Sequence, residues 1–171
     1  MTHTLPTASD AIVVQWRTMG GLSIDRSNIA DLTIYADGKT VVSPRFSRGN
    51  LVEKQLEMRQ IQDLLRFAID ENHFFGFDGR AVDAEIKGSL RQRQAAPLGA
   101  GVIAVPLGPP YVDAGITMIL IAADRQEHEV SFQGLAFAAQ DFPEIEALQQ
   151  LRTIELKLLN VAEELANCNR E

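Results

Sequence analysis

The spacing of apolar residues changes along this chain, and each change predicts an element. Residues 11–19 (AIVVQWRTM) are rich in β-branched and aromatic side chains and stop at a glycine pair, which is typical of a strand. Residues 31–42 predict a hairpin around Asp37 and Gly38, where we expect a type I′ turn because both positions tolerate positive φ. Residues 116–132 predict a second hairpin, whose nearly all-apolar first arm suits a central strand.

Two further segments follow the 3.6-residue period of an amphipathic helix. From about residue 51 to residue 70, apolar residues fall on one side and charged residues mostly on the other. Residues 141–167 predict a longer helix, in which Asp141 caps the N-terminus, Pro143 stands in the first turn and Glu144 completes a capping-box-like pattern. Its apolar stripe consists of Ile145, Leu148, Leu151, Ile154, Leu158, Val161, Ala162 and Leu165.

Residues 78–112 follow neither period. They mix basic residues, glycines and four of the seven prolines, so we expect a long loop that is either functional or contains a short strand at 101–105. We expect residues 1–10 to be a flexible N-terminus and residues 11–171 to form a single domain.

The predicted order is strand, hairpin, helix, long loop, hairpin and helix. Short antiparallel strands beside long one-faced helices predict an α+β fold. We expect an antiparallel sheet of about five strands, built from the lone strand and the two hairpins, with two helices on one face. The two hairpin-then-helix halves align when YADGK is matched to AADRQ, which is compatible with duplication or with chance.

Composition narrows the class of partner. The 171 residues are 46% hydrophobic and 23% charged, as in globular proteins, and the net charge of −7 predicts no nucleic-acid partner because a duplex-coating protein needs a basic face. No apolar run approaches the roughly 18 residues of a membrane span. Cys168 is the only cysteine, which fits a reducing compartment, and the first ten residues lack the pattern of a secretory signal. We therefore expect a cytoplasmic protein without a membrane partner.

The densest group of acidic, histidine and aromatic residues is DENHFFGFDGRAVD, at 70–83. One interpretation is a metal site or acid–base pair made by Asp70, Glu71, His73 and Asp78. The other is a helix end, where Asn72 or Gly76 takes a permissive φ and the phenylalanines enter the core. We favour the helix end, because helical metal ligands stand three or four residues apart on one face and His73 lies beyond the expected last turn.

Other candidate sites are weaker. The chain has no G-x-S-x-G elbow and no phosphate-binding glycine motif, so we expect no cofactor and assign no catalytic residue. A small metal-dependent enzyme remains the alternative, using His73, His128 and a carboxylate such as Asp78 or Asp113, while His3 lies on the terminus. A basic cluster predicts either a grip on an acidic partner or a solvated loop, and it comprises Arg80, Lys87, Arg91 and Arg93.

Several features in order resemble a family of small bacterial proteins of which emfourin, an inhibitor of thermolysin-like metallopeptidases such as protealysin, is the named example. These features are a first strand ending in MGG, a leucine-rich helix leading into HFFGF, Asp113 just before a strand, a hairpin arm with HEV and a proline-opened helix with EALQQL. The resemblance spans residues 12–151, and residues 78–110 and the end of the last helix depart from it. It implies an α+β scaffold that binds a protein partner and performs no chemistry.

We therefore expect a non-catalytic protein-binding module whose partner the sequence does not name. The expected contacts lie on glycine-containing or recognition loops and in the basic cluster, and they are Gly20, Gly21, Leu22, Arg91, Arg93, Tyr111 and Asp113. A third hypothesis is a structural subunit, a homodimer in which the last helix packs against a second copy from about Leu156 onward.

Overall fold

A computed structural model describes residues 2–20, 29–95 and 114–167. It contains a six-stranded antiparallel sheet in the order β4-β3-β2-β1-β5-β6. The strands are β1 (Ile12–Met19), β2 (Leu32–Tyr35), β3 (Lys39–Val42), β4 (Val52–Gln55), β5 (Ile116–Ala123) and β6 (Gln126–Gln133). The predicted α+β class is confirmed, with β4 added to the expected strands.

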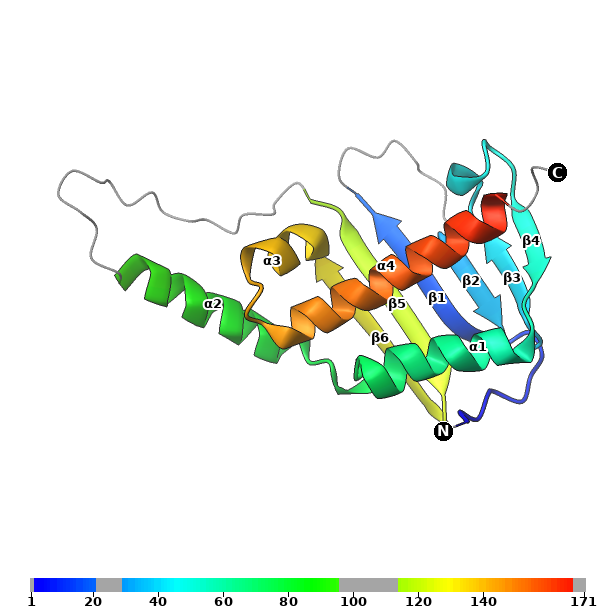
Figure 1. Cartoon of the computed structure of the whole chain (residues 1–171), viewed down its shortest axis with the longest axis horizontal. Helices are drawn as coiled ribbons and strands as arrows, with labels where there is room; N and C mark the ends of the chain where they lie inside the picture. Colours follow the sequence, from blue (N-terminus) through cyan, green and yellow to red (C-terminus); the bar gives the residue numbers. More distant parts are fainter. Residues whose placement is uncertain (1, 21–28, 96–113, 168–171) are drawn as a thin grey trace.

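The helices are α1 (Met58–Leu65), α2 (Gly79–Ala95), α3 (Leu135–Asp141) and α4 (Glu146–Asn167). Short 3₁₀ turns occupy Pro44–Phe46 and Phe74–Gly76, and a π-helical turn occupies Arg66–Glu71. Figure 1 shows α1 and α4 lying across one face of the sheet, as predicted, while α2 extends beyond the β6 edge.

The core lies between the sheet and these helices. Trp16 on β1 pairs with Leu32 on β2 and with Ile119 on β5, and all three side chains are buried. The predicted stripe of α4 covers them, and its buried members are Leu148, Leu151, Ile154, Leu158 and Ala162. The apolar periodicity of the last helix therefore identified the correct face.

The two hairpin turns differ from each other and from expectation. The first is a three-residue connection in which the Gly38 N–H donates to the Tyr35 carbonyl at 3.0 Å, and only Gly38 has positive φ. The predicted type I′ turn is therefore wrong there, and a type I turn with a glycine bulge takes its place. The second turn has positive φ at both Asp124 and Arg125, so the type I′ geometry occurs at this hairpin.

Three predicted boundaries need correction. The helix expected from residue 51 begins at Met58, because β4 comes first and a capping box at Glu57 starts α1. The helix expected from residue 141 begins at Glu146, because Asp141 ends α3. Within the expected loop at 78–112, residues 79–95 form helix α2, and 96–113 lie outside the described residues.

Helix α2 has clear physical causes. The Asp78 side chain accepts a hydrogen bond from the Arg80 amide at 2.9 Å, which caps the N-terminus. Val82, Ile86 and Leu90 recur every four residues and pack against the core, with Val82 fully buried. All four prolines of the segment come after residue 96, so none interrupts the helix.

Candidate functional site

The end of the sheet where β1, β3 and β6 finish and β2, β4 and β5 begin is called the loop end. At this end, Met19 pairs with Ile116, so the end of β1 and the start of β5 lie side by side. A Cβ atom on Gly115 would stand 3.3 Å from the Met19 carbonyl oxygen. Gly20, which follows β1, and Gly115, which precedes β5, therefore lie at one place on the sheet.

Of the seven expected contact residues, Gly20, Arg91 and Arg93 lie in the described part of the chain. Gly20 has a φ of +77° and is exposed, as a glycine turn requires. The other four lie outside the described residues, and they are Gly21, Leu22, Tyr111 and Asp113.

A buried carboxylate fixes one side of the loop end. Asp31 is 3% exposed and accepts hydrogen bonds from the Thr18 amide at 2.7 Å and the Thr18 hydroxyl at 2.6 Å. Arg45 donates to the same carboxylate at 3.0 Å and lies over the ring of Phe46. A buried charge is stable only when it is paired and hydrogen-bonded, and Asp31 meets both conditions.

A second buried carboxylate lies beside the first. Thr117 pairs with Thr18 across the β1–β5 ladder, and its hydroxyl donates to Glu155 of α4 at 2.6 Å. Glu155 is 5% exposed and forms an ion pair with Arg152, one turn earlier. The adjacent threonines thus anchor two acid–arginine pairs, which tie β2 and α4 to the central strands at the loop end.

Exposed apolar side chains are also concentrated at this end. Ile29 precedes β2, Leu51 precedes β4 and Phe137 lies on α3 just after β6, with exposures of 44%, 48% and 57%. In the described residues only two other large hydrophobic side chains are exposed, and they are Met58 and Leu156. The loop end therefore combines a stiff polar frame with accessible apolar groups.

Arg93 attaches the C-terminal part of α2 to the segment between α3 and α4. Its guanidinium donates to the Asp141 carbonyl at 2.6 Å and lies 4.6 Å from the centre of the Phe142 ring. It also approaches the Glu144 carboxylate at 3.3 Å. The backbone amide of Glu144 itself, the Ser89 hydroxyl and Arg93 lower the pKa of that carboxyl group.

The remaining basic residues of α2 form a separate group. Lys87 and Arg91 follow Arg80 by seven and eleven residues, which are close to two and three helical turns. The three side chains therefore lie on one face of the helix, and all three are exposed. Arg93 faces elsewhere. The predicted cluster of four is therefore a group of three with one residue committed to packing.

Within the stretch at 70–83, residues 70–78 form a helix end and residues 79–83 begin α2. Phe74 is buried, and the side-chain amide of Asn72 donates to the Phe67 carbonyl at 2.8 Å. His73 takes the left-handed conformation with a φ of +51°, where Asn72 or Gly76 was expected. His128 contacts the Phe77 carbonyl at 3.2 Å and the edge of the Phe74 ring. In the described ranges no three His, Cys, Asp or Glu side chains are grouped closely enough to hold a metal ion.

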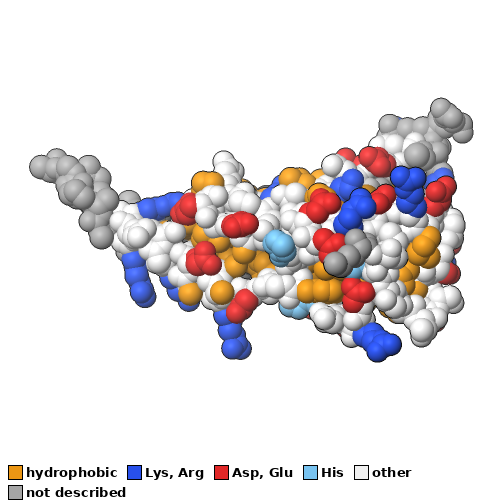
Figure 2. All heavy atoms as spheres, turned by 60° about the horizontal axis from the view of Figure 1, so that its bottom comes forward, with side chains coloured by type: hydrophobic (Ala, Val, Ile, Leu, Met, Phe, Trp, Pro, Cys, Tyr) orange, Lys and Arg blue, Asp and Glu red, His pale blue; other side chains and the backbone are white. Residues whose placement is uncertain are grey.

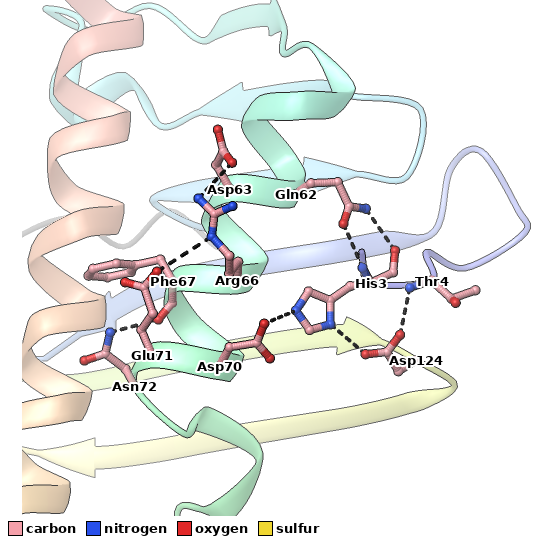
Figure 3. A network of polar contacts seen from close by, with 10 residues as sticks. All are labelled: His3, Thr4, Gln62, Asp63, Arg66, Phe67, Asp70, Glu71, Asn72 and Asp124. Atoms are coloured by element: carbon pink, nitrogen blue, oxygen red, sulfur yellow. Dashed lines mark hydrogen bonds and ion pairs between the residues drawn. The ribbon is translucent and has the colours of Figure 1, made fainter. Parts of the chain in front are cut away.

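His3 is a residue whose role the sequence did not reveal. It is 6% exposed, so this residue of the expected flexible N-terminus packs into the fold. Its Nδ1 donates to Asp124 at 2.7 Å, while Nε2 makes no described hydrogen bond but lies 3.4 Å from the Asp70 carboxylate. Gln62 bonds both the His3 amide and its carbonyl, as Figure 3 shows. Partners 59 to 121 residues away leave no local signal.

The group of His3, Asp70, Gln62 and Asp124, called the N-terminal clasp, fastens the terminal segment to the end of the sheet opposite the loop end. The Thr4 amide donates to Asp124 at 2.7 Å, and the Asp124 amide donates to the Thr4 carbonyl at 2.8 Å. The hydrogen bond from His3, followed by that from Thr4, lowers the pKa of the Asp124 carboxyl group. Asp124 is a non-glycine residue at positive φ, and these contacts also offset the strain of that conformation.

Comparison with known proteins found no family model, no curated protein and no solved structure that matches this chain. Among the described helices, none has the length and apolar character needed to cross a membrane.

Proposed function

We propose that this chain is a non-catalytic protein-binding module that contacts its partner through the loop end. The main observation behind the proposal is the Met19–Ile116 pair, because it places the end of β1 beside the start of β5. Recognition segments on a rigid sheet are a common way to bind proteins, since the scaffold lowers the entropy lost on association.

The surface chemistry of the loop end supports the same proposal. Ile29 and Leu51 are about half exposed, although nearby core positions bury similar side chains almost completely. Apolar groups of this kind, set among polar neighbours, are typical of protein-interaction sites. The frame around Asp31 and Glu155 holds the strands that present them.

The partner class follows from the sequence resemblance. An emfourin-like module would bind a thermolysin-like metallopeptidase, so a purified enzyme of that type is the first partner to test. The chain at equimolar concentration should then inhibit cleavage of a casein substrate. Absence of inhibition would exclude this partner class. The more general proposal, a protein-binding module, would then be tested by the experiment below.

The test of the binding module uses matched surface variants. Ile29→Ser with Leu51→Ser alters the loop end, whereas Met58→Ser removes a similarly exposed apolar group at the opposite end of the sheet. The immobilised wild type should capture a stoichiometric protein from an extract of its source organism, and the first variant should lose at least about tenfold in affinity for it. Equal capture by both variants contradicts a loop-end contact.

A further inference from the structure

The outer side of β6 pairs with no other strand in the described part of the chain, and the start of α2 lies near it. β6 is eight residues long and pairs with β5. The Gly134 amide donates to the Gly115 carbonyl at 2.8 Å, so these two residues form a hydrogen-bonded pair. Hydrogen-bonded and non-hydrogen-bonded pairs alternate along an antiparallel ladder, so the even-numbered residues of β6 bond to β5. The non-hydrogen-bonded pairs contain Glu127, Glu129 and Ser131. The backbone N–H and C=O groups of these three residues therefore point away from β5, toward the open edge of the sheet.

The two sheet edges are protected to different degrees. β4, at the opposite edge, has four residues and carries Lys54. Short length and lysine are devices that prevent edge-to-edge association. β6 (QEHEVSFQ) is twice as long, it contains no proline or lysine, and its pairing with β5 has no β-bulge. Its acidic side chains are the main barrier to an incoming strand.

A groove of about 310 Å³ runs beside this edge. Phe77, Asp78 and Gly79 line one side, and residues 128–131 line the other. The half-buried Phe77 is one of its lining residues, and the half-buried Phe132 follows the lining residues of β6 in sequence. Figure 2 shows hydrophobic side chains gathered where helix α2 joins the rest of the molecule.

We propose that the β6 edge binds an extended segment of a partner protein as a seventh strand, and that this segment alternates apolar residues with lysine or arginine. Side chains alternate between the two faces of a sheet. The apolar residues would lie on the helix-bearing face beside His128, Val130 and Phe132. The basic residues would lie on the other face beside Glu127 and Glu129, both exposed.

Charge argues for a foreign strand over a second copy. Two β6 edges joined antiparallel would bring the glutamates of both copies onto one face of the joined sheet, and close like charges across a ladder are destabilising. A basic strand pairs with the same glutamates. The site is separate from the loop end, so this inference does not rest on the function proposed above.

The test uses a synthetic peptide that alternates lysine with valine over about eight residues, the length of β6. Nuclear magnetic resonance titration should show saturable binding, with the amide signals of Glu127, Glu129 and Ser131 shifting most. Glu127→Lys with Glu129→Lys should weaken binding at least about tenfold. Ser131→Pro should abolish it, because this substitution removes an outward N–H that the β5 ladder does not use.

Two controls make the result specific to the edge. Glu53→Lys reverses an exposed acid on β4, at the opposite edge, and should leave peptide affinity unchanged. A peptide that alternates glutamate with valine should not bind. The proposal is wrong if the lysine peptide fails to bind folded wild type, if the charge-reversed variant binds it equally, or if the edge instead forms a concentration-dependent dimer.

Discussion

Individual residues with unusual backbone geometry offer the sharpest tests of the fold. A Cβ atom on Gly38 would stand 2.5 Å from the Leu56 carbonyl oxygen, and its φ is +91°. Gly38→Ala should therefore lower the free energy of unfolding by about 2–3 kcal/mol, through both strain and overlap. Gly49 has a φ of +96° with open space around it, so Gly49→Ala should cost only about 1 kcal/mol. Equal losses in urea denaturation would contradict the close approach of β4.

The N-terminal clasp predicts a pH dependence at one residue. Because folding lowers the pKa of Asp124, its ionised form stabilises the folded state, and this contribution is present at neutral pH. It is lost as pH falls below the unfolded value of about 3.9 and through the folded pKa. Asp124→Asn should therefore cost about 1 kcal/mol at pH 7 and progressively less below about pH 4.

Asp37→Asn is the matched control for that prediction. Asp37 also accepts a backbone hydrogen bond in a hairpin turn, from the Lys39 amide at 2.8 Å, but no described histidine contacts it. At pH 7 Asp37→Asn should cost less than Asp124→Asn, because the Asp37 carboxylate lacks a histidine partner. A pH-independent cost for Asp124→Asn, measured by urea denaturation at several pH values, would contradict the clasp.

At the scale of elements, Arg93 ties the C-terminal part of α2 to the segment between α3 and α4. Arg93→Gln removes the ring contact with Phe142 and the ion pair with Glu144. Amide exchange over residues 86–95 should then accelerate by about tenfold, with a loss of no more than about 1 kcal/mol in global stability. Arg91→Gln, on the exposed face of the same helix, should leave exchange unchanged. Equal acceleration in both variants would show that Arg93 does not hold the helix.

The sequence predicted correctly those elements that are specified by the spacing of apolar residues within the element itself. Val130 and Phe132 alternate with polar residues, and the α4 stripe recurs at helical spacing, so both elements were found. Helix α2 was missed because the prolines after residue 96 dominated the composition of its segment. The four-residue β4 was missed because it is a strand only by pairing with β3, and residues 52–55 fit a helical pattern equally well.

Sites assembled from distant residues were not predictable in the same way. His3, Asp70 and Asp124 meet across more than a hundred residues of chain, and Thr18 meets Asp31 only after the strands pair. Gly20 was recognised as a turn because glycine at a strand end is a local signal. Its position beside Gly115 follows from the β1–β5 register, which one sequence does not specify.

At the scale of the whole molecule, the predicted homodimer through α4 remains a prediction. Leu158, Ala162 and Ala166 of its distal half are buried against the chain's own fold, while Leu156 is 40% exposed. If α4 forms an interface, Leu156→Asp should convert a dimer to a monomer in sedimentation equilibrium. A wild type that stays monomeric at high concentration would contradict that interface.

The central claim is that the loop end is the contact surface for a protein partner. Hydrogen exchange of the free chain and of the chain saturated with its captured partner tests this claim most directly. The account predicts slower exchange at Gly20, Ile29, Leu51 and Gly115 in the complex, with no change at the hairpin turns of the opposite end. Protection confined to the N-terminal clasp or to the outer surfaces of α1 and α4, with the loop end unchanged, would contradict it.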